Sequence, residues 1–508
     1  MNLSYATIRP IDVPIPAERQ AAKRHYGVHP YFTRRPFNVV REYILHYSKP
    51  RDTVLDPFGG SGVTAIEAFL ENRVGVHNDI NPLANFIASG IADLSKGNIE
   101  DYQHALYYVE DRCAKTLHQL EQIGEVELAA INKSLILPPN CALPSNSDVE
   151  HYHDLFTPRQ LTALALLKQA VDEIPQRYPK QAMLLAWSAA LTKLNKTFLS
   201  AEGRAESRGG SSIFSIYRYK LAKNPVELPS WQTFKERAQN VIAAKREVDK
   251  TIEVKKRTEG WFGSFRVMSK DIQALSEQFE QQIDYIFTDP PYGGHISYLD
   301  LSTLWNSWLG CNPTDEDRSH ELIVGGELGL SETNYVDRLR GSIKACMHML
   351  KPRRWLSVVF QHWNAAYFEA ILTSAESGGG ELKAAISQVG DPIWSMHKKK
   401  RNESVLAGEL ILTFFKSGAR PRVRQKNQFN VHDALYNILA ASPSEIYGES
   451  LFNQLVIEAW KASAIESLNI SKTEFIQLLK DHGWQYHERN HYWSRGANTN
   501  RRLFAVGP

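Results

Sequence analysis

Short apolar runs that end in glycine, proline or acidic residues stand out along this chain. The runs at 53–55, 74–76 and 283–287 have the length of buried strands, and each ends in a polar turn. The first run passes through a glycine-rich turn into a helix, and residues 38–48 upstream also have helical character. A strand that enters a helix in this way is typical of the nucleotide-binding units of α/β folds.

Between residues 96 and 260 the pattern becomes mainly helical. Apolar residues recur at helical spacing over 101–120, 157–174 and 181–194, and a charged helix is predicted over 231–253. The polar, glycine-rich stretch 200–212 predicts a loop, and residues 213–219 predict a strand.

The pattern changes again after residue 427. Helical spacing over 432–441 and 450–464 is followed by Ser471-Lys-Thr-Glu474, a capping box that predicts a helix to about residue 481. Residues 483–493 then predict a hairpin. Helices followed by a hairpin are typical of a winged-helix arrangement, which would bind DNA or a partner protein.

The composition is that of a soluble globular chain. Its 508 residues, 43% of them apolar, suffice for about three domains and a substantial core. No apolar stretch approaches the roughly 18 residues of a membrane span, and the N-terminus lacks a charged-then-apolar signal, so no membrane contact is expected. The four cysteines, at 113, 141, 311 and 346, form no close pair, which predicts a reducing cytoplasm and no zinc site.

Net charge is only +3, so partners have to be inferred from local clusters. Basic residues concentrate at 204–208, 398–401 and 420–426. The cluster at 398–401 is either a grip on a phosphate backbone or a plain exposed turn, and the cluster at 420–426 favours a linker.

A glycine-rich loop, Asp56-Pro57-Phe58-Gly59-Gly60-Ser61-Gly62, follows the first strand. Its glycines let the backbone approach a ligand closely. Asp79, which lies seventeen positions after Gly62 at the end of the second strand, is placed to hydrogen-bond a ribose diol. Glycine spacing alone would also allow a dinucleotide such as NAD.

The tetrapeptide Asp289-Pro290-Pro291-Tyr292 follows the run at 283–287 after one residue. Asp289 can accept one hydrogen of a planar NH2 group and the Pro290 carbonyl can accept the other, which frees the nitrogen lone pair to attack. Proline fixes φ and has no N–H, and Tyr292 offers a flat face on which a base can stack. Taken alone, such a sequence is also typical of a simple turn.

Together the two motifs resemble those of S-adenosylmethionine-dependent DNA amino-methyltransferases. D-P-F-x-G-S-G is similar to their motif I, and D-P-P-Y to their catalytic motif. Tyr31 is followed by Phe32-Thr33-Arg34-Arg35-Pro36, an F-x-x-R-P core that looks like the segment closing over the methionine end of the cofactor. Asp271 stands where the family places a contact to the adenine of the cofactor.

The resemblance continues past the catalytic motif. From Asp289 to Ser302 the chain is similar, without a gap, to the D-P-P-Y-x-x-x-x-x-Y-x-D-L-S segment of large bacterial DNA adenine methylases. Gly293, Gly294 and His295 depart from the bulkier residues expected there. The turn beneath the base is therefore expected to differ, and target preference is the property that the resemblance supports least.

The resemblance implies a Rossmann-like α/β methyltransferase sheet built from 1–95, with the cofactor motifs, and 261–418, with the catalytic motif. It implies that 96–260 is a helical insertion that recognises the target, while 427–508 forms a small C-terminal helical domain. The implied reaction moves a methyl group from S-adenosylmethionine to adenine N6 of double-stranded DNA, after base flipping and without a metal. Companion restriction or defence proteins are further implied partners.

Three other functions stay open. Cytosine N4 is also a ring amino group, and D-P-P-Y-G is familiar in enzymes that methylate guanine N2 of transfer RNA. A catalytically silent DNA-binding subunit is the third, although the intact Asp289, Gly60 and Gly62 argue against it. No Pro-Cys dipeptide occurs, which removes the usual nucleophile of cytosine C5 methylation.

Overall fold

The computed structural model describes residues 4–18, 22–120, 122–199, 210–223, 225–294, 296–389, 408–417, 428–446, 448–468, 470–487 and 492–496. All three basic clusters, at 204–208, 398–401 and 420–426, lie outside the described residues. So do most of the predicted loop 200–212 and His295.

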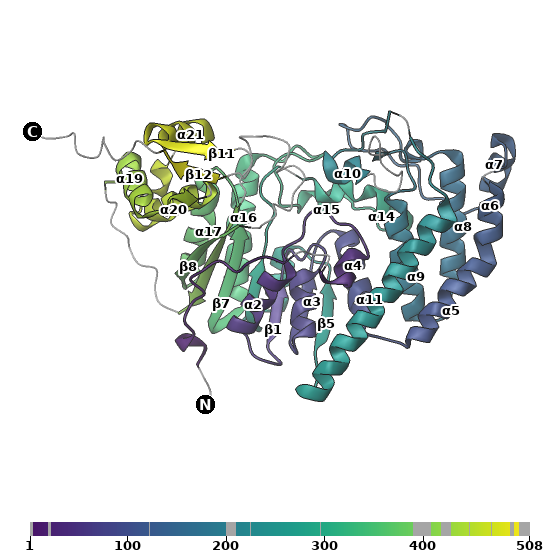
Figure 1. The fold of residues 1–508 in the computed structure, drawn as a ribbon, viewed down its shortest axis with the longest axis horizontal. Helices are drawn as coiled ribbons and strands as arrows, with labels where there is room; N and C mark the ends of the chain where they lie inside the picture. Colours follow the sequence, from purple (N-terminus) through teal and green to yellow (C-terminus); the bar gives the residue numbers. More distant parts are fainter. Residues whose placement is uncertain are drawn as a thin grey trace, which may run out of the picture.

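A seven-stranded sheet forms the centre of the molecule (Figure 1). Its strands, in spatial order, are β5 (Ser264–Met268), β2 (Val74–Asn78), β1 (Thr53–Asp56), β6 (Ile283–Thr288), β7 (Leu350–Phe360), β9 (Gly408–Lys416) and β8 (Gly380–Val389). The first five run parallel, and β9 is antiparallel to both of its neighbours. The predicted α/β class with a Rossmann-like sheet is confirmed.

The strand order reverses between β1 and β6. From β1 the chain proceeds outward to β2 and β5 on one side, and then returns to β6 on the other side. Connections that diverge in this way leave a crevice at the carboxyl ends of the two central strands. Asp56 ends β1 and Asp289 follows β6, so the topology brings both carboxylates to the same crevice.

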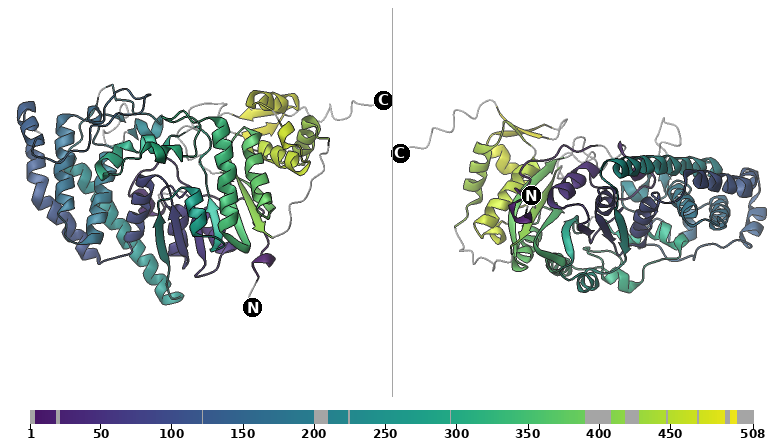
Figure 2. Two further views of the ribbon diagram at one scale, coloured as in Figure 1. Left: turned by 180° about the vertical axis from the view of Figure 1, so that it is seen from behind. Right: turned by 90° about the horizontal axis from the view of Figure 1, so that it is seen from below.

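Helices cover both faces of the sheet (Figures 1 and 2). One face carries α2 (Phe37–Tyr47), α3 (Val63–Leu70) and α4 (Pro82–Asp93), and the other carries α12 (Ile272–Gln278), α16 (Glu332–Met349) and α17 (Ala365–Ser377). Alternate residues of β6 point into the two cores: Tyr285 and Phe287 into the first, and Ile286 into the second. All of β6 is buried, as expected for a strand covered on both faces.

The insertion is a group of helices beside the sheet, to the right in Figure 1. It contains α5 (Ile99–Val109), the π-helical turn η3 (Glu110–Ala114), α6 (Lys115–Leu120), α7 (Glu125–Asn132), α8 (Pro158–Asp172), α9 (Arg177–Leu191) and α11 (Ser230–Thr258). The four predicted helical stretches are confirmed, with ends shifted by a few residues. Their apolar faces continue the core that lies under α2, α3 and α4.

The strand predicted over 213–219 is wrong. Residues Ser212–Ser215 form the short helix α10, whose first turn is capped because Ser211 Oγ accepts the Ile213 N–H. The strand before it, β4 (Gly210–Ser211), pairs with β3 (Phe198–Leu199) over two residues and then ends. An alternating sequence becomes a strand only where a partner strand supplies hydrogen bonds to its backbone. Here β3 pairs with residues 210–211 alone, and Ser211 caps the helix that follows.

The C-terminal unit is small and mixed. In chain order it contains α19 (Val431–Ala441), β10 (Glu445–Ile446), α20 (Gly448–Lys461), α21 (Lys472–Asp481), β11 (Trp484–His487) and β12 (Tyr492–Arg495). The three strands form one antiparallel sheet in the order β10-β12-β11, and the predicted capping box at Ser471 and Glu474 is confirmed. No helix within the described ranges is long and apolar enough to cross a membrane.

Candidate functional site

The loop after β1 is shaped by glycines at two close approaches. A Cβ on Gly59 would lie 2.2 Å from Nδ1 of the buried His77, so no larger residue fits there. Gly62 has a φ of +88° and directly precedes α3, where a Cβ would lie 2.7 Å from Ala88 Cβ. The glycines therefore allow the loop to turn tightly against β2 and α4.

Asp56 links this loop by hydrogen bonds to β6, the strand that precedes the D-P-P-Y motif. Its carboxylate accepts hydrogen bonds from Phe58 N (3.1 Å), Thr64 Oγ1 (2.8 Å) and Thr288 Oγ1 (2.9 Å). Thr288 immediately precedes Asp289, so one buried carboxylate fixes the ends of both β1 and β6. Burial raises the pKa of Asp56 to about 7.

Asp79 and Asp271 lie on the neighbouring loops. Asp79 accepts the N–H of Gly60 and the N–H of Asn81, each at 2.8 Å, and burial raises its pKa to about 6. Asp271 accepts the Gln273 N–H at 2.9 Å and thereby caps α12. Each ionised carboxylate has further lone pairs, so these bonds leave acceptor capacity for a ligand.

A cavity of about 430 Å³ lies at the crevice between β1 and β6. Ten of the residues predicted to bind or react line it: Tyr31, Asp56, Pro57, Phe58, Gly59, Gly60, Asp79, Asp271, Asp289 and Pro291. The other four, which are Phe32, Gly62, Pro290 and Tyr292, are not in its wall.

Phe32 supports the wall from behind. It is 8% exposed, and its ring meets the ring of Tyr298 edge-on at 5.5 Å. Tyr298 in turn lies parallel to Tyr31, with ring centroids 6.3 Å apart, and both line the cavity. The aromatic segment before α2 is thus held by the segment after the catalytic motif.

Arg34 was not singled out from the sequence. Its guanidinium donates to Ser61 Oγ (2.9 Å), to the His29 carbonyl (2.5 Å) and to the Tyr26 carbonyl. All of these acceptors are uncharged, and Arg34 pairs with no carboxylate in the part of the chain that the structure describes. Burial lowers its pKa to about 10. A buried cation at the cavity wall with no carboxylate partner among the described residues has the charge to pair with an anionic ligand group.

Both oxygens of the Asp289 carboxylate are engaged. Tyr292 donates its hydroxyl to Oδ1 at 2.5 Å, and the guanidinium of Arg35 binds Oδ2. Arg35 also donates to the Tyr292 hydroxyl at 2.8 Å and forms an ion pair with Glu409 on β9. Burial raises the pKa of Asp289, and the charge of Arg35 opposes that rise.

The two prolines present different carbonyls. Tyr335 on α16 donates its hydroxyl to the Pro291 carbonyl at 2.6 Å. The Pro290 carbonyl accepts no hydrogen bond from the described residues.

After the motif, Gly293 has a φ of +73°, and a Cβ on Gly294 would lie 2.7 Å from the Val324 carbonyl oxygen. The glycines that depart from the family pattern are therefore required by this turn.

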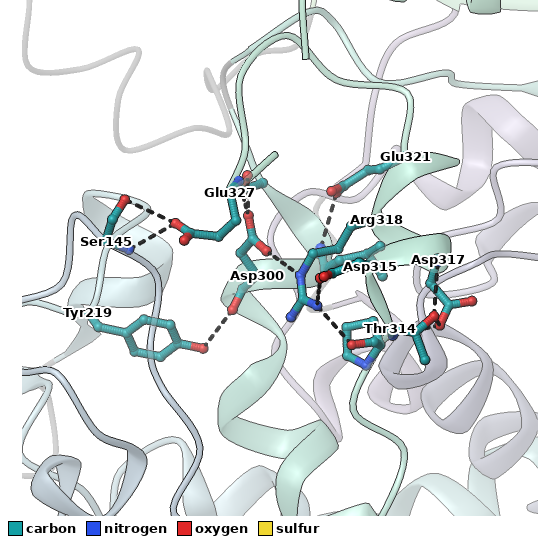
Figure 3. A network of polar contacts seen from close by, with 12 residues as sticks. Ser145, Tyr219, Asp300, Thr314, Asp315, Asp317, Arg318, Glu321 and Glu327 are labelled. Atoms are coloured by element: carbon teal, nitrogen blue, oxygen red, sulfur yellow. Dashed lines mark hydrogen bonds and ion pairs between the residues drawn. The ribbon is translucent and has the colours of Figure 1, made fainter. Parts of the chain in front are cut away.

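Asp300 joins the segment after the motif to two distant parts of the chain (Figure 3). Its carboxylate accepts from Arg318 Nε at 3.2 Å and from Glu327 N at 3.3 Å, while its backbone carbonyl accepts from the Tyr219 hydroxyl at 3.1 Å. Glu327 in turn accepts from Ser145 N at 2.8 Å. Because Ser145 and Tyr219 belong to the insertion, this network connects the insertion to residues 261–418, the catalytic half that contains the D-P-P-Y motif.

Glu321 is another cavity residue that the sequence did not reveal. It is 5% exposed, lines the cavity, and accepts the Leu299 N–H at 3.1 Å. Burial raises its pKa to about 8, so it is mostly protonated at neutral pH. No motif surrounds it, and only the folding of the 310–330 loop over the segment at 298–302 brings it to the cavity.

Comparison with known proteins gives one family match. Residues 12–88 match the model of a DNA methylase family of the N6/N4 type. A solved structure of an antibiotic-related methyltransferase shares 11% sequence identity, with a TM-score of 0.18, over 40% of this chain and 78% of that chain. No curated protein matches the sequence.

Proposed function

We propose that the protein transfers a methyl group from S-adenosylmethionine to adenine N6 in DNA, a proposal supported by the match of residues 12–88 to the model of a DNA methylase family. The observation that carries the proposal is the cavity shared by two motifs. The Asp56–Gly62 loop forms one part of its wall and Asp289 forms another, although more than 200 residues separate them in sequence. A bound methyl donor and an amino group held by Asp289 would therefore be neighbours.

The residues of the cavity fit the proposed cofactor. Its volume of about 430 Å³ lies within the range of about 300–1,000 Å³ that is usual for small-molecule sites. Asp79 would accept hydrogen bonds from ribose hydroxyls, and Arg34 would pair with the carboxylate of the methionine part. When bound, S-adenosylmethionine supplies an electrophilic methyl group on a sulfonium that leaves as a neutral thioether.

The chain's own residues account for the activation of the amino group. Asp289 would accept one amino hydrogen, and the Pro290 carbonyl, which has no described donor, would accept the other. With both hydrogens held, the lone pair is localised on the nitrogen instead of conjugated with the base ring, and it can attack the methyl group. The extra proton then passes from the nitrogen to the Asp289 carboxylate that accepts its hydrogen and from there to solvent water, and no covalent bond to the enzyme forms.

The target base must leave the duplex to reach Asp289. Unstacking and unpairing it costs a few kcal/mol, which stacking on Tyr292 and hydrogen bonds to the base edge would offset. Residues 96–260 are the proposed recognition region, since Ser145 and Tyr219 of the insertion are bonded to the segment that follows the catalytic motif.

Cytosine N4 is the second candidate target. The matched family is of the N6/N4 type, and the same two acceptors would hold the amino group of cytosine. Guanine N2 of transfer RNA and a catalytically silent DNA-binding role have weaker support. All four alternatives differ in the labelled product, so one assay separates them.

The test is tritiated methyl transfer to duplex DNA and to bulk transfer RNA at the same ionic strength, followed by identification of the labelled nucleoside. We expect N6-methyladenine from DNA. N4-methylcytosine would retain the fold and mechanism but change the base, whereas label confined to guanine of RNA would overturn the DNA assignment. No transfer to either polymer would favour the silent subunit.

Asp289→Ala tests the role of the carboxylate. Because Asp289 would bind the substrate rather than the cofactor, this variant should lower the transfer rate about 100-fold or more while calorimetry still detects S-adenosylmethionine binding. Asp337→Ala, which removes an exposed carboxylate on α16, is the matched control and should keep full activity. Retained turnover in the first variant would disprove the assignment.

A further inference from the structure

Arg35 connects three elements that are far apart in sequence. It precedes α2, and its guanidinium meets Asp289 after β6, Tyr292 in the same loop and Glu409 on β9. The side chains of Arg35, Asp289 and Glu409 are 15%, 20% and 19% exposed. A contact of this kind between largely buried charges holds its members in fixed positions.

The charge of Arg35 matters because Asp289 accepts an amino hydrogen more strongly when its carboxylate is ionised. A protonated carboxyl would itself offer a hydrogen, and its acceptor strength would fall. Burial favours the protonated form and raises the pKa of Asp289, while Arg35 is the strongest influence in the opposite direction.

The other groups around Asp289 act in both directions. Glu409 raises the pKa of Asp289 by like charge, and Tyr292 lowers it through its hydrogen bond. Asp56 and Tyr298 also face the carboxylate from the end of β1 and from α13 (Tyr298–Leu301), and neither carries a positive charge. Among the described residues that face Asp289, Arg35 is therefore its cationic partner.

Glu409 explains how Arg35 keeps its orientation. Each of the three guanidinium nitrogens has its own partner: Nε binds Asp289, one terminal nitrogen binds Glu409 and the other binds the Tyr292 hydroxyl. The guanidinium group of Arg35 is thus held by three partners. Asp289 Oδ2 is held by a charge, whereas Oδ1 is held by one hydroxyl that an incoming amino group can replace.

We propose that Arg35 is a positioning residue: anchored by Glu409, it holds the Asp289 carboxylate ionised and leaves Oδ1 as the acceptor for the amino group of the target base. The proposal rests on the function proposed above. It assigns roles to Arg35, the arginine of the F-x-x-R-P core, and to Glu409 on β9.

The pH dependence of methyl transfer tests this proposal. In Arg35→Gln the rate at pH 7 should fall about 100-fold, because the carboxylate is both misplaced and more readily protonated. Without the cation, the pKa of Asp289 rises further, so the acid limb of the rate profile moves to higher pH and part of the activity returns on the alkaline side. Cofactor affinity measured by calorimetry should be unchanged.

Three further variants sharpen the comparison. Arg35→Lys keeps the positive charge but has a single nitrogen in place of the three of the guanidinium group. It should therefore shift the acid limb of the rate profile less than Arg35→Gln. Glu409→Gln should produce a smaller loss than Arg35→Gln, since the cation stays but loses its anchor. Arg24→Gln, an exposed arginine eleven positions upstream, should match the wild type. An equal loss at every pH in Arg35→Gln would overturn the proposal, because it would indicate a purely structural role.

A thermal unfolding cycle keeps this test separate from that of the proposed function. Arg35→Gln and Asp289→Asn should each lower the melting temperature, and their combination should lower it by less than the sum of the two shifts. Additive shifts would overturn the pairing even if the enzyme is active. If the wild type transfers no methyl group to any nucleic acid, the proposed function fails, and the unfolding cycle alone decides whether Arg35 holds Asp289.

Discussion

At the scale of single residues, Tyr292 has two uses that compete with each other. Its hydroxyl donates to Asp289 Oδ1 at 2.5 Å, which is the oxygen left for an incoming amino group. Its ring is the proposed stacking surface for the target base, and it now packs edge-on against Phe360 with centroids 5.1 Å apart. The hydroxyl therefore occupies Asp289 Oδ1, the acceptor that a base stacked on the Tyr292 ring would need.

These two uses of Tyr292 predict losses of very different size for two substitutions. Tyr292→Phe removes the competing donor and keeps the ring, so kcat/KM for DNA should stay within about 3-fold of the wild type. Tyr292→Ala also removes the stacking surface, which is worth about 1–3 kcal/mol per base, and kcat/KM should fall about 10-fold to 100-fold. Steady-state kinetics on the methylated duplex measure both, and equal losses in the two variants would contradict a stacking role.

At the scale of elements, the stretch 216–223 links the insertion to the catalytic half. Tyr219 is buried and donates its hydroxyl to the Leu301 carbonyl at 2.7 Å. Lys220 and Lys223 next to it are exposed, whereas Arg218 already pairs with Asp148. If the protein binds duplex DNA as proposed, cations on this stretch, which is bonded to the segment after the D-P-P-Y motif, are expected to contact its phosphates.

The salt dependence of DNA binding tests this placement. If Lys220 and Lys223 each contact one phosphate, Lys220→Ala with Lys223→Ala should lower the slope of log K against log salt by about 2. Lys115→Ala, an exposed lysine on α6 in the outer part of the insertion, is the control and should leave the slope unchanged. Fluorescence anisotropy over a salt series measures the slopes. An unchanged slope in the double variant would exclude this surface as a phosphate contact.

At the scale of the whole molecule, an aromatic cluster is among the contacts that join the C-terminal unit to the sheet. Trp363, which follows β7, meets Phe452 of α20 at 4.5 Å and Phe475 of α21 at 5.8 Å between ring centroids. Phe452 and Phe475 are buried, and the cluster is part of the core under α16 and α17. The unit is therefore packed onto the catalytic half by a shared core.

Removing one member of that cluster should loosen the unit without touching the cavity. Phe452→Ala should lower the free energy of unfolding by about 3 kcal/mol, as is usual for a buried phenylalanine. Because Phe452 does not line the cavity, S-adenosylmethionine affinity should be unchanged. Tyr436→Ala, an exposed aromatic of the same unit, is the control. Thermal melting measures both variants, and equal melting temperatures would show that the cluster does not hold the unit.

The sequence alone determined the local parts of this protein. The α/β class, the helices of the insertion and the capping box at Ser471 followed from periodicity and turn chemistry, because a helix and its cap depend on residues a few positions apart. The loops at 56–62 and 289–292 followed from glycine, proline and acidic residues at strand ends. The chemical roles of these loop residues stay predictions, although the cavity contains most of them.

Only the tertiary structure decided which charges meet. Arg35 and Asp289 are 254 positions apart in the sequence, and Glu409, which also contacts Arg35, lies on β9, still farther along the chain. These contacts exist because β6 lies beside β1 and β9 lies beside β7, and strand order is set by the packing of helices on both faces rather than by local pattern. The same dependence on distant partners explains why 213–219 does not form the predicted strand, why the F-x-x-R-P core did not reveal the role of Arg34 within it, and why no pattern in the sequence revealed Glu321 or the network around Asp300.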